Sequence, residues 1–441
     1  GLCAARAAQA CGLRTALTID LPPLAMHIPT NPPTVRRAAE LFREPALSVW
    51  KSRILMALTF AAALAGAPRG GAVAQSFQTS APNAILMDAD SRTVLFEKGA
   101  DDLVVPASTV KIMTAELVFR DLAAGRFKLD DTMSISEKAW RTGGSGGSSM
   151  FAQLNSRPRI EDLLRGLIVQ SGNDAAIALA EGVAGTEDAF AAMMTQRARE
   201  LGLPKSTFKN AWGGAHAEQR VSPREMAALS LHLIRAYPEY YKYFAEREFT
   251  WNKIRQLNRN PLLMMDIGAD GLKTGNIDAS GYGLVGSAVD KETGQRLVVA
   301  VYGAKTAKER AEEARKLLTW GMRGFEARPL FNAGDEIGTA QVFGGDKSSV
   351  ALTTGTPIRL LLPRGSAERL TAKVVYTGPV PAPIEPGQAV ARLKVWRGAV
   401  LALDMPLVAA EGVAIGPLHR RAYDAGVEYA TVLFRKYVLK K

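Results

Sequence analysis

The spacing of hydrophobic and polar residues changes several times along the chain, and each change predicts a different kind of element. Residues 84–97 alternate in the manner of two strands joined by a turn at 88–92. Apolar residues then recur every three to four positions in four stretches, which predict helices at residues 108–125, 160–169, 175–182 and 186–201. Between the first two of these, the Gly/Ser-rich residues 142–149 predict a loop.

Further signals follow over the next hundred residues. Ser222 is placed to cap a helix, because proline follows it directly and glutamate lies three residues on. Residues 271–289 predict a strand, a turn and a second strand, and 296–302 predict another strand. Residues 308–321 have the pattern of a basic amphipathic helix. We expect the first folded unit, residues 75–328, to end there.

A different pattern begins after this unit. Residues 333–416 carry short apolar runs that glycine and proline interrupt, and none is long enough for a helix. They predict a small all-β domain, either a sandwich or a barrel.

Residues 417–441 predict an amphipathic helix. Its apolar stripe recurs at steps of three and four residues and consists of Tyr423, Val427, Ala430, Phe434, Tyr437 and Val438. Basic residues gather at its end: Arg435, Lys436, Lys440 and Lys441. Such a helix can lie in an anionic membrane surface or pack on its own domain, and the terminal cationic cluster favours the membrane.

The pattern near the start of the chain predicts an export signal at residues 49–74. A short basic region at 51–53 precedes the uncharged apolar run 54–66, and Ala72 and Ala74 supply the small residues of a cleavage site. The run is short for a membrane span, and a buried helix is the alternative. Residues 1–48 precede this signal and show no helical or strand periodicity. Our hypothesis is that they are an upstream extension from a misassigned start.

Composition narrows the class of protein. Of the 441 residues, 47% are hydrophobic and 22% are charged, which excludes a disordered chain and a multi-span membrane protein. The net charge of +12 suits an anionic membrane or an acidic substrate. The basic residues are scattered without interleaved aromatics, so we expect no nucleic-acid partner. Both cysteines, Cys3 and Cys11, lie in the extension, and no ligand cluster indicates a metal or another cofactor.

The first chemical motif is an S-x-x-K that joins Ser108 to Lys111. Residues three apart on a helix share a face, so the Lys111 amine can reach the Ser108 hydroxyl. A serine hydroxyl needs a nearby base to become a nucleophile, and lysine can act as that base only when neutral. Taken alone, the motif is weak, because chance supplies it often.

Two further motifs strengthen this interpretation. An S-x-N brings Ser171, which could pass on a proton, and Asn173, which could hold Lys111 and a substrate carbonyl. A K-T-G follows at Lys273, Thr274 and Gly275 in a strand context. Lys273 could be the cation that keeps Lys111 neutral, and with Thr274 it could hold a substrate carboxylate. Gly275 would let an extended substrate approach the strand edge.

These motifs and the sequence around them resemble a known family. The set occurs in penicillin-binding proteins and class A β-lactamases. The segments PASTVKIMTAELV, LIVQSGNDAAIALAEGVAG and DGLKTGNIDASGYGLVGSA resemble the low-molecular-mass (type-5) penicillin-binding proteins, which are serine-type D-alanyl-D-alanine carboxypeptidases. The resemblance implies an α/β (α+β) transpeptidase-like domain with an antiparallel sheet flanked by helices. An all-β domain and an amphipathic anchoring helix would follow.

The resemblance also implies an activity. Ser108 would attack the bond between the two D-alanines of a peptidoglycan stem pentapeptide, with Lys111 as base. The backbone N–H groups of Ser108 and Asn276 would bind the oxyanion. Arg310 resembles an arginine that assists near this site, although a solvated helix charge is an equal alternative. Members close to the type-5 enzyme usually carry histidine where this chain has Asn276, which leaves the deacylation rate open.

The implied protein is exported to the periplasm and associates with the outer face of the cytoplasmic membrane through its terminal helix. β-Lactam antibiotics would acylate the same serine. Three alternatives remain: a D,D-endopeptidase shares all three motifs, a β-lactamase has the same fold, and a non-catalytic penicillin-binding scaffold would belong to another class. No E-x-x-L-N string supports a β-lactamase, and the intact Ser108 and Lys111 argue against a scaffold.

Overall fold

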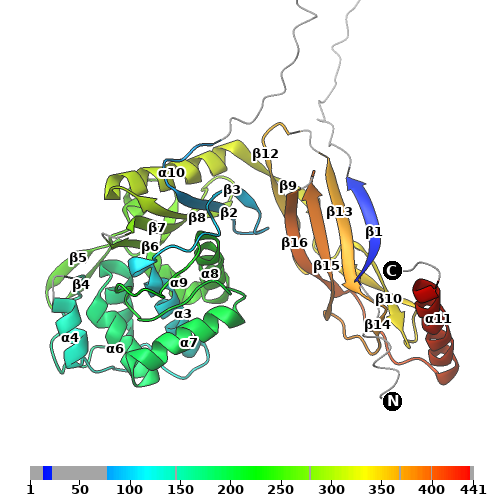
Figure 1. Cartoon of the computed structure of the whole chain (residues 1–441), viewed down its shortest axis with the longest axis horizontal. Coiled ribbons are helices and arrows are strands. Elements are labelled where there is room, and N and C mark those ends of the chain that lie inside the picture. The colour runs from blue at the N-terminus through cyan, green and yellow to red at the C-terminus, as the bar shows by residue number, and fades with distance from the viewer. Residues whose placement is uncertain are drawn as a thin grey trace, which may run out of the picture. The chain divides into compact units, whose positions relative to one another are not determined.

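The computed structural model describes residues 13–21, 77–144, 147–277, 280–366, 369–398 and 400–437 (Figure 1). The expected export signal, residues 49–74, lies outside the described residues.

A five-stranded sheet forms the centre of the larger domain, in the order β3-β2-β8-β7-β6 with every pair antiparallel. Its strands are β2 (Asn83–Asp88), β3 (Val94–Lys98), β6 (Ala269–Ile277), β7 (Gly281–Val289) and β8 (Arg296–Ala304). The sequence predicted all five of these strands. Helices flank the sheet (Figure 1), which confirms the predicted arrangement.

Both faces of the sheet are buried, because successive residues of a strand point to opposite sides. Along β8, Val298 and Ala300 join the core that contains α3 and α8, whereas Val299 and Val301 join the core of α10. Strand β8 therefore reads as a continuous apolar run. The helices are α3 (Lys111–Ala123), α5 (Ile160–Arg165), α6 (Asn173–Ala184), α7 (Glu187–Glu200), α8 (Pro223–Ala236), α9 (Pro238–Tyr241) and α10 (Ala307–Gly324).

Several local predictions can be compared directly. The Ser222 hydroxyl accepts a hydrogen bond from the Glu225 N–H, so the predicted cap of α8 is confirmed. Helix α4 (Glu137–Gly144) extends into the predicted Gly/Ser loop, so the first three residues of that loop are helical. The hairpin of β4 (Glu248–Trp251) and β5 (Ile254–Leu257) was not predicted, because both strands are very short.

The smaller domain is all-β, as predicted. Strand β9 (Phe325–Phe331) pairs with β12 (Ile358–Pro363) and crosses the expected end of the first unit at residue 328. A second sheet has the order β1-β13-β15-β16-β11-β10-β14. Its strands from this region are β10 (Gly338–Phe343), β11 (Ser349–Thr353), β13 (Leu370–Thr377), β14 (Val380–Pro381), β15 (Ala389–Arg397) and β16 (Val400–Ala409).

The remaining strand of that sheet lies in the upstream extension. Strand β1 (Leu13–Leu21) pairs antiparallel with β13, and Leu21 lies opposite Leu370. The expectation that residues 1–48 lack strand periodicity is therefore wrong at this place. The segment LRTALTIDL does alternate apolar and polar residues, but its partner lies about 350 residues further along the chain. No local signal indicates such a distant pairing.

The C-terminal helix α11 spans Leu418–Tyr437. It contacts the all-β domain, where the Asp424 carboxylate accepts a hydrogen bond of 2.9 Å from the Gly344 N–H. Four of its apolar side chains are exposed: Leu418, Tyr423, Val427 and Tyr429, of which Tyr423 is 72% exposed. Within the part of the chain that the structure describes, no helix combines the length and apolar character needed to cross a membrane.

Candidate active site

Ser108 and Lys111 lie at the start of the helix that the sequence predicted. Ser108 belongs to a short 3₁₀ helix, η1 (Ala107–Val110), and Lys111 is the first residue of α3. The Lys111 Nζ lies 3.3 Å from the Ser108 Oγ. Thr109 anchors this turn, because its hydroxyl donates to the Pro106 carbonyl. The predicted reach of the amine to the hydroxyl is therefore present.

Two further oxygen atoms surround the Lys111 amine. It donates to the Asn173 Oδ1 at 2.9 Å and to the Trp212 carbonyl at 2.5 Å. The turn that carries Trp212 approaches the nucleophile closely, because Gly213 has a φ of +92° and a Cβ there would lie 2.1 Å from the Ala107 carbonyl oxygen. Only glycine fits this position. The sequence analysis anticipated Asn173 but not the Trp212 carbonyl.

The S-x-N motif lies at a distorted junction between two helices. The π-helix η2 (Gly166–Gln170) ends at Ser171, whose φ of +66° is left-handed. Gly172 is the N-cap of α6, and Asn173 is its first residue. Ser171 and Asn173 are both buried. π-Bulges of this kind occur often at functional sites, so the distortion agrees with the position of the motif.

The K-T-G motif lies on β6, the edge strand of the central sheet, beside η1. Lys273 and Thr274 are buried, and Asn276 is exposed. A Cβ at Gly275 would lie 2.8 Å from the Pro106 carbonyl oxygen and 3.2 Å from the Ser108 nitrogen. The missing side chain therefore lets the strand touch the backbone of the serine turn. This contact brings the first and third motifs together.

Burial changes the acidity of both lysines. Lys111 is 1% exposed, and burial, followed by repulsion from Arg259, lowers its pKa to about 7, while the charge of Asp174 acts in the opposite direction. Burial lowers the pKa of Lys273 well below its usual value, and repulsion from Lys111, Arg259 and Arg310 adds to the effect. The sequence analysis gave Lys273 the task of keeping Lys111 neutral. Lys273 lies close enough to Lys111 for mutual repulsion, and Arg259 is a further cation that lowers the pKa of Lys111.

Arg259 is thus a functional candidate that the sequence analysis missed. Its Nη1 donates to the Ser148 Oγ at 2.8 Å, and its backbone N–H donates to the Val169 carbonyl at 3.2 Å. It follows the β4–β5 hairpin and lies next to the S-x-N junction. Its segment, FTWNKIRQLNRNPLL, is one of those that resemble the family, but the irregular pattern there did not mark Arg259 as a site residue.

Arg310 is not the solvated helix charge that was one interpretation. It lies on α10 with 8% of its surface exposed, and its guanidinium carbon is 5.6 Å from the centre of the Tyr282 ring. Its Nε has no hydrogen-bond partner among the described residues. Because Arg310 also contributes to the lowered pKa of Lys273, the two side chains lie near each other. They form a corner of the site that is lined by basic side chains.

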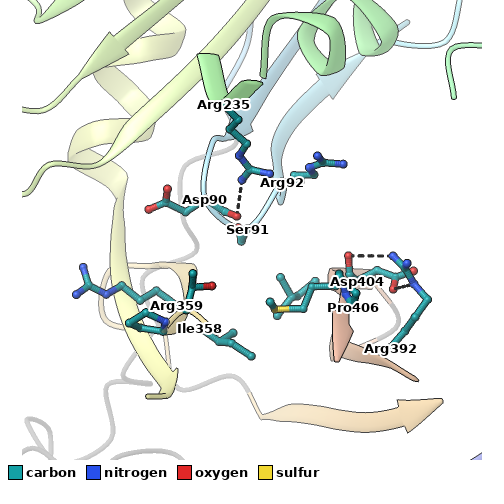
Figure 2. Close-up of a pocket in the computed structure, with 13 residues that line it drawn as sticks. Asp90, Ser91, Arg92, Arg235, Ile358, Arg359, Arg392, Asp404 and Pro406 are labelled. Carbon is teal, nitrogen blue, oxygen red and sulfur yellow. Dashed lines mark hydrogen bonds and ion pairs between the residues drawn. The ribbon is translucent and has the colours of Figure 1, made fainter. Parts of the chain in front are cut away.

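A pocket of 790 Å³ lies elsewhere and contains none of the motif residues (Figure 2). In it the Arg235 guanidinium donates to the Asp90 carbonyl, and Arg392 pairs with Asp404. Its lining holds no serine–lysine pair. Among the described residues, no group of three or more histidines, cysteines or acidic residues is placed to hold a metal ion.

A serine hydroxyl beside a buried amine of low pKa, with a second buried lysine on the adjacent strand, defines a serine–lysine acyl-transfer site. Comparison with sequence families gives the same class. Residues 70–306 match the D-alanyl-D-alanine carboxypeptidase family, and residues 325–414 match the penicillin-binding protein 5 C-terminal domain. The chain belongs to the D-alanyl-D-alanine carboxypeptidase family.

Individual relatives agree with this assignment. The chain is 39% identical to D-alanyl-D-alanine carboxypeptidase DacC of Escherichia coli (strain K12), over 81% of this chain and 91% of the relative. Identity to DacA of the same strain is 37%, over 79% and 87%. The crystal structure of penicillin binding protein 5 from Haemophilus influenzae matches with a TM-score of 0.68 at 35% identity, covering 77% of this chain and 98% of that one.

Proposed function

We propose that this protein is a serine D-alanyl-D-alanine carboxypeptidase that removes the terminal D-alanine from peptidoglycan stem pentapeptides and is acylated by β-lactams. The observation that carries the proposal is the Lys111 amine, which has a pKa of about 7 and lies 3.3 Å from the Ser108 hydroxyl. An amine of ordinary pKa would be protonated at neutral pH and could not accept a proton. The family membership supports the substrate class.

The reaction divides into two steps. Ser108 Oγ attacks the carbonyl carbon of the scissile amide while neutral Lys111 takes the hydroxyl proton. The tetrahedral intermediate collapses, the C–N bond breaks, and the leaving D-alanine nitrogen receives a proton by way of Ser171. Water then attacks the Ser108 ester, which releases the shortened peptide and restores the hydroxyl. A β-lactam undergoes the first step with opening of its ring, so its leaving nitrogen stays attached.

The substrate is held by charge and by backbone donors. Lys273, Thr274 and Arg310 bind the terminal carboxylate, since the buried Arg310 Nε lacks a partner among the described residues and a carboxylate accepts from guanidinium. The N–H groups of Ser108 and Asn276 bind the oxyanion. The exposed Asn276 side chain replaces the histidine usual near the type-5 enzyme, which affects the rate at which the ester is hydrolysed.

Domain order and export complete the proposal. Residues 49–74 direct export to the periplasm, residues 75–328 carry the chemistry, and residues 333–416 support them. Residues 417–441 bind the outer face of the cytoplasmic membrane. The exposed apolar side chains of Leu418, Tyr423, Val427 and Tyr429 support this role, because apolar residues on a cationic helix insert into the interface.

Release of D-alanine from a pentapeptide ending in D-alanyl-D-alanine tests the activity. We expect the wild-type chain to release it and Ser108→Ala to lose at least a thousandfold in rate. A fluorescent penicillin should label the wild type stably and leave Ser108→Ala unlabelled. Ser156→Ala, which removes a hydroxyl outside the site, is the control and should behave like the wild type.

Other results of this experiment point to the alternatives. Rapid turnover of the penicillin would identify a β-lactamase. Cleavage of cross-linked dimers in preference to the pentapeptide would identify an endopeptidase. Absence of both labelling and D-alanine release would contradict the proposal and favour a binding scaffold.

A further inference from the structure

Asp174 is a buried carboxylate beside the motif residue Asn173, and nothing in the reaction described above uses it. It is 1% exposed and occupies the second position of α6. Every hydrogen bond described for its side chain comes from a neutral donor, so it differs from an ordinary ion-pair partner. A buried charge without a directly bound counter-ion is costly unless dipoles satisfy it fully. The groups that stabilise this carboxylate must therefore be identified.

Four donors satisfy the two oxygens of Asp174. Oδ1 accepts from the Met150 N–H at 3.0 Å and from the Ala175 N–H at 3.0 Å. Oδ2 accepts from the Ser149 hydroxyl at 2.8 Å and from the Ala152 N–H at 3.1 Å. Three of these donors belong to residues 147–152, which we name the cleft loop. The fourth belongs to α6, and the helix N-terminus adds a favourable dipole.

The same loop also holds Asn173. The Asn173 N–H donates to the Ser148 carbonyl at 2.7 Å, and its Oδ1 accepts from Lys111 at 2.9 Å. The position of the amide relative to the catalytic amine thus depends on the fit of the cleft loop against the start of α6. Asp174 makes most of the side-chain bonds that maintain this fit.

We propose that Asp174 is a positioning residue of the reaction, which fixes the cleft loop to α6 and so holds Asn173 against Lys111. The inference rests on the proposed role of Lys111 as base. Asp174 contacts neither the reacting hydroxyl nor the substrate. Its effect passes through Asn173 and through its own negative charge.

Two glycines make room for this carboxylate. A Cβ at Gly143 would lie 2.8 Å from the Asp174 Cβ, and a Cβ at Gly172 would lie 2.7 Å from its Oδ1. Both distances are well inside normal contact. The glycine of the S-x-N motif therefore serves the Asp174 carboxylate as well as the turn.

The charge of Asp174 has a separate effect. The charged groups that influence Lys111 are Arg259, which lowers its pKa, and Asp174, which raises it. Lys273 lies close enough for repulsion between the two lysines. Removing the negative charge leaves the opposing effect of the Arg259 charge on the amine unbalanced. The base then becomes neutral at a lower pH, which gives the proposal a readout that loss of structure would not produce.

The test measures the second-order rate of acylation by a fluorescent penicillin as a function of pH. Asp174→Asn places an amide NH₂ against two donors, so the cleft loop loosens. We expect a loss of tenfold or more in the acylation rate at neutral pH. We also expect the acidic limb of the pH–rate profile, where the rate falls as Lys111 becomes protonated, to shift to lower pH. Ser149→Ala removes one bond and no charge. It should lower the rate two- to fivefold with an unchanged limb.

Asp188→Asn is the matched control, because Asp188 is also the second residue of a helix, α7, but is exposed. It should leave both the rate and the limb unchanged. Wild-type behaviour of a folded Asp174→Asn would overturn the proposal, as would a lower rate with an unshifted limb. If circular dichroism shows that Asp174→Asn does not fold, an unchanged rate in Ser149→Ala would overturn it. Failure of the wild-type enzyme to be acylated would instead contradict the proposed function.

Discussion

The properties of the site depend most strongly on the Lys111 amine. Its amine is enclosed, and oxygens of Ser108, Asn173 and Trp212 surround it. Burial disfavours the charged form, whereas the Asn173 and Trp212 oxygens accept hydrogen bonds from the amine and orient it toward the serine. In the proposed reaction, these two influences make Lys111 a base that is neutral near pH 7 and directed at the Ser108 hydroxyl. The residue would be a poor base if either were missing.

The first prediction concerns the pH dependence of acylation. Because the pKa of Lys111 is about 7, its neutral fraction falls as the pH decreases below that value. The acylation rate should be half-maximal near pH 7 and fall about tenfold per pH unit well below it. Stopped-flow measurement with a chromogenic cephalosporin would show this limb. A limb near pH 10 would mean that the amine has its ordinary pKa.

The second prediction concerns Arg259, whose charge lowers the pKa of Lys111. Arg259→Gln removes that repulsion, so the acidic limb should move to higher pH and the rate at pH 6 should fall several-fold. Arg259→Lys should retain the limb. Arg255→Gln is the control, because Arg255 lies on the hairpin just before Arg259 but pairs with Glu248 at the surface. An equal shift in both glutamine variants would refute the specific role of Arg259.

The sequence revealed some of these residues and not others, for a physical reason. Ser108 and Lys111 lie three positions apart, so one helical turn joins them and their spacing is informative. The Trp212 carbonyl is a backbone group 101 residues from Lys111, and no residue type identifies it. Arg259 reaches the site only because two strands fold back. Contacts of this kind depend on the tertiary structure.

At the scale of elements, the close approach of the Gly213 turn to η1 limits which residues can replace that glycine. Gly213 and Gly202 both have positive φ, at +92° and +74°. A Cβ at Gly213 meets the Ala107 backbone, whereas a Cβ at Gly202 meets nothing within 4 Å. Both positions thus have a left-handed backbone that is unfavourable for alanine, but only Gly202 has space for a Cβ.

The third prediction follows from this comparison. Gly202→Ala should lower the free energy of unfolding by about 1 kcal/mol, the cost of left-handed backbone for a residue with a Cβ. Gly213→Ala should lower it by ~3 kcal/mol or more, because the turn must also move away from η1. It should slow acylation as well, since the Trp212 carbonyl moves with the turn. Urea unfolding of both variants gives the comparison, and equal losses would contradict it.

Elements with a strong local signal were predicted, and those that depend on distant partners were not. Helix α8 has its own cap and apolar face, and strands β7 and β8 are long apolar runs. Strand β9 contains a proline and charged residues, so its pairing with β12 left little trace in the sequence. Strand β1 could be predicted only if one knew that β13 has an edge available for pairing. Such pairing is determined by the assembled sheet.

At the scale of the whole molecule, the order of the two domains was evident from the change in pattern near residue 330. The long helical periodicities stop there, and short strands begin. The position of the boundary was less evident, because β9 spans residues assigned to both sides of it. A strand that continues without a break from α10 gives no turn signal in the sequence to mark the change.

The fourth prediction concerns the C-terminal helix. Tyr423→Ser combined with Val427→Ser removes exposed apolar side chains while leaving the Asp424 bond to Gly344 in place. We expect binding to vesicles containing anionic phosphatidylglycerol to weaken at least tenfold, with D-alanine release in solution unchanged. Vesicles of neutral phosphatidylcholine are the control and should bind weakly throughout. Undiminished binding to anionic vesicles would contradict the anchoring role.

The left-handed backbone of Ser171 has a consequence for how this enzyme can be improved. A serine at φ +66° costs about 1 kcal/mol relative to glycine, which adopts this conformation freely. Selection for thermal robustness alone would therefore favour glycine at this position, and the resulting protein would lack the hydroxyl proposed to carry a proton. At Ser171, the change that increases stability would thus decrease turnover. Ranking variants by melting temperature alone would therefore select Ser171→Gly, and the loss of activity would be seen only if turnover were measured as well.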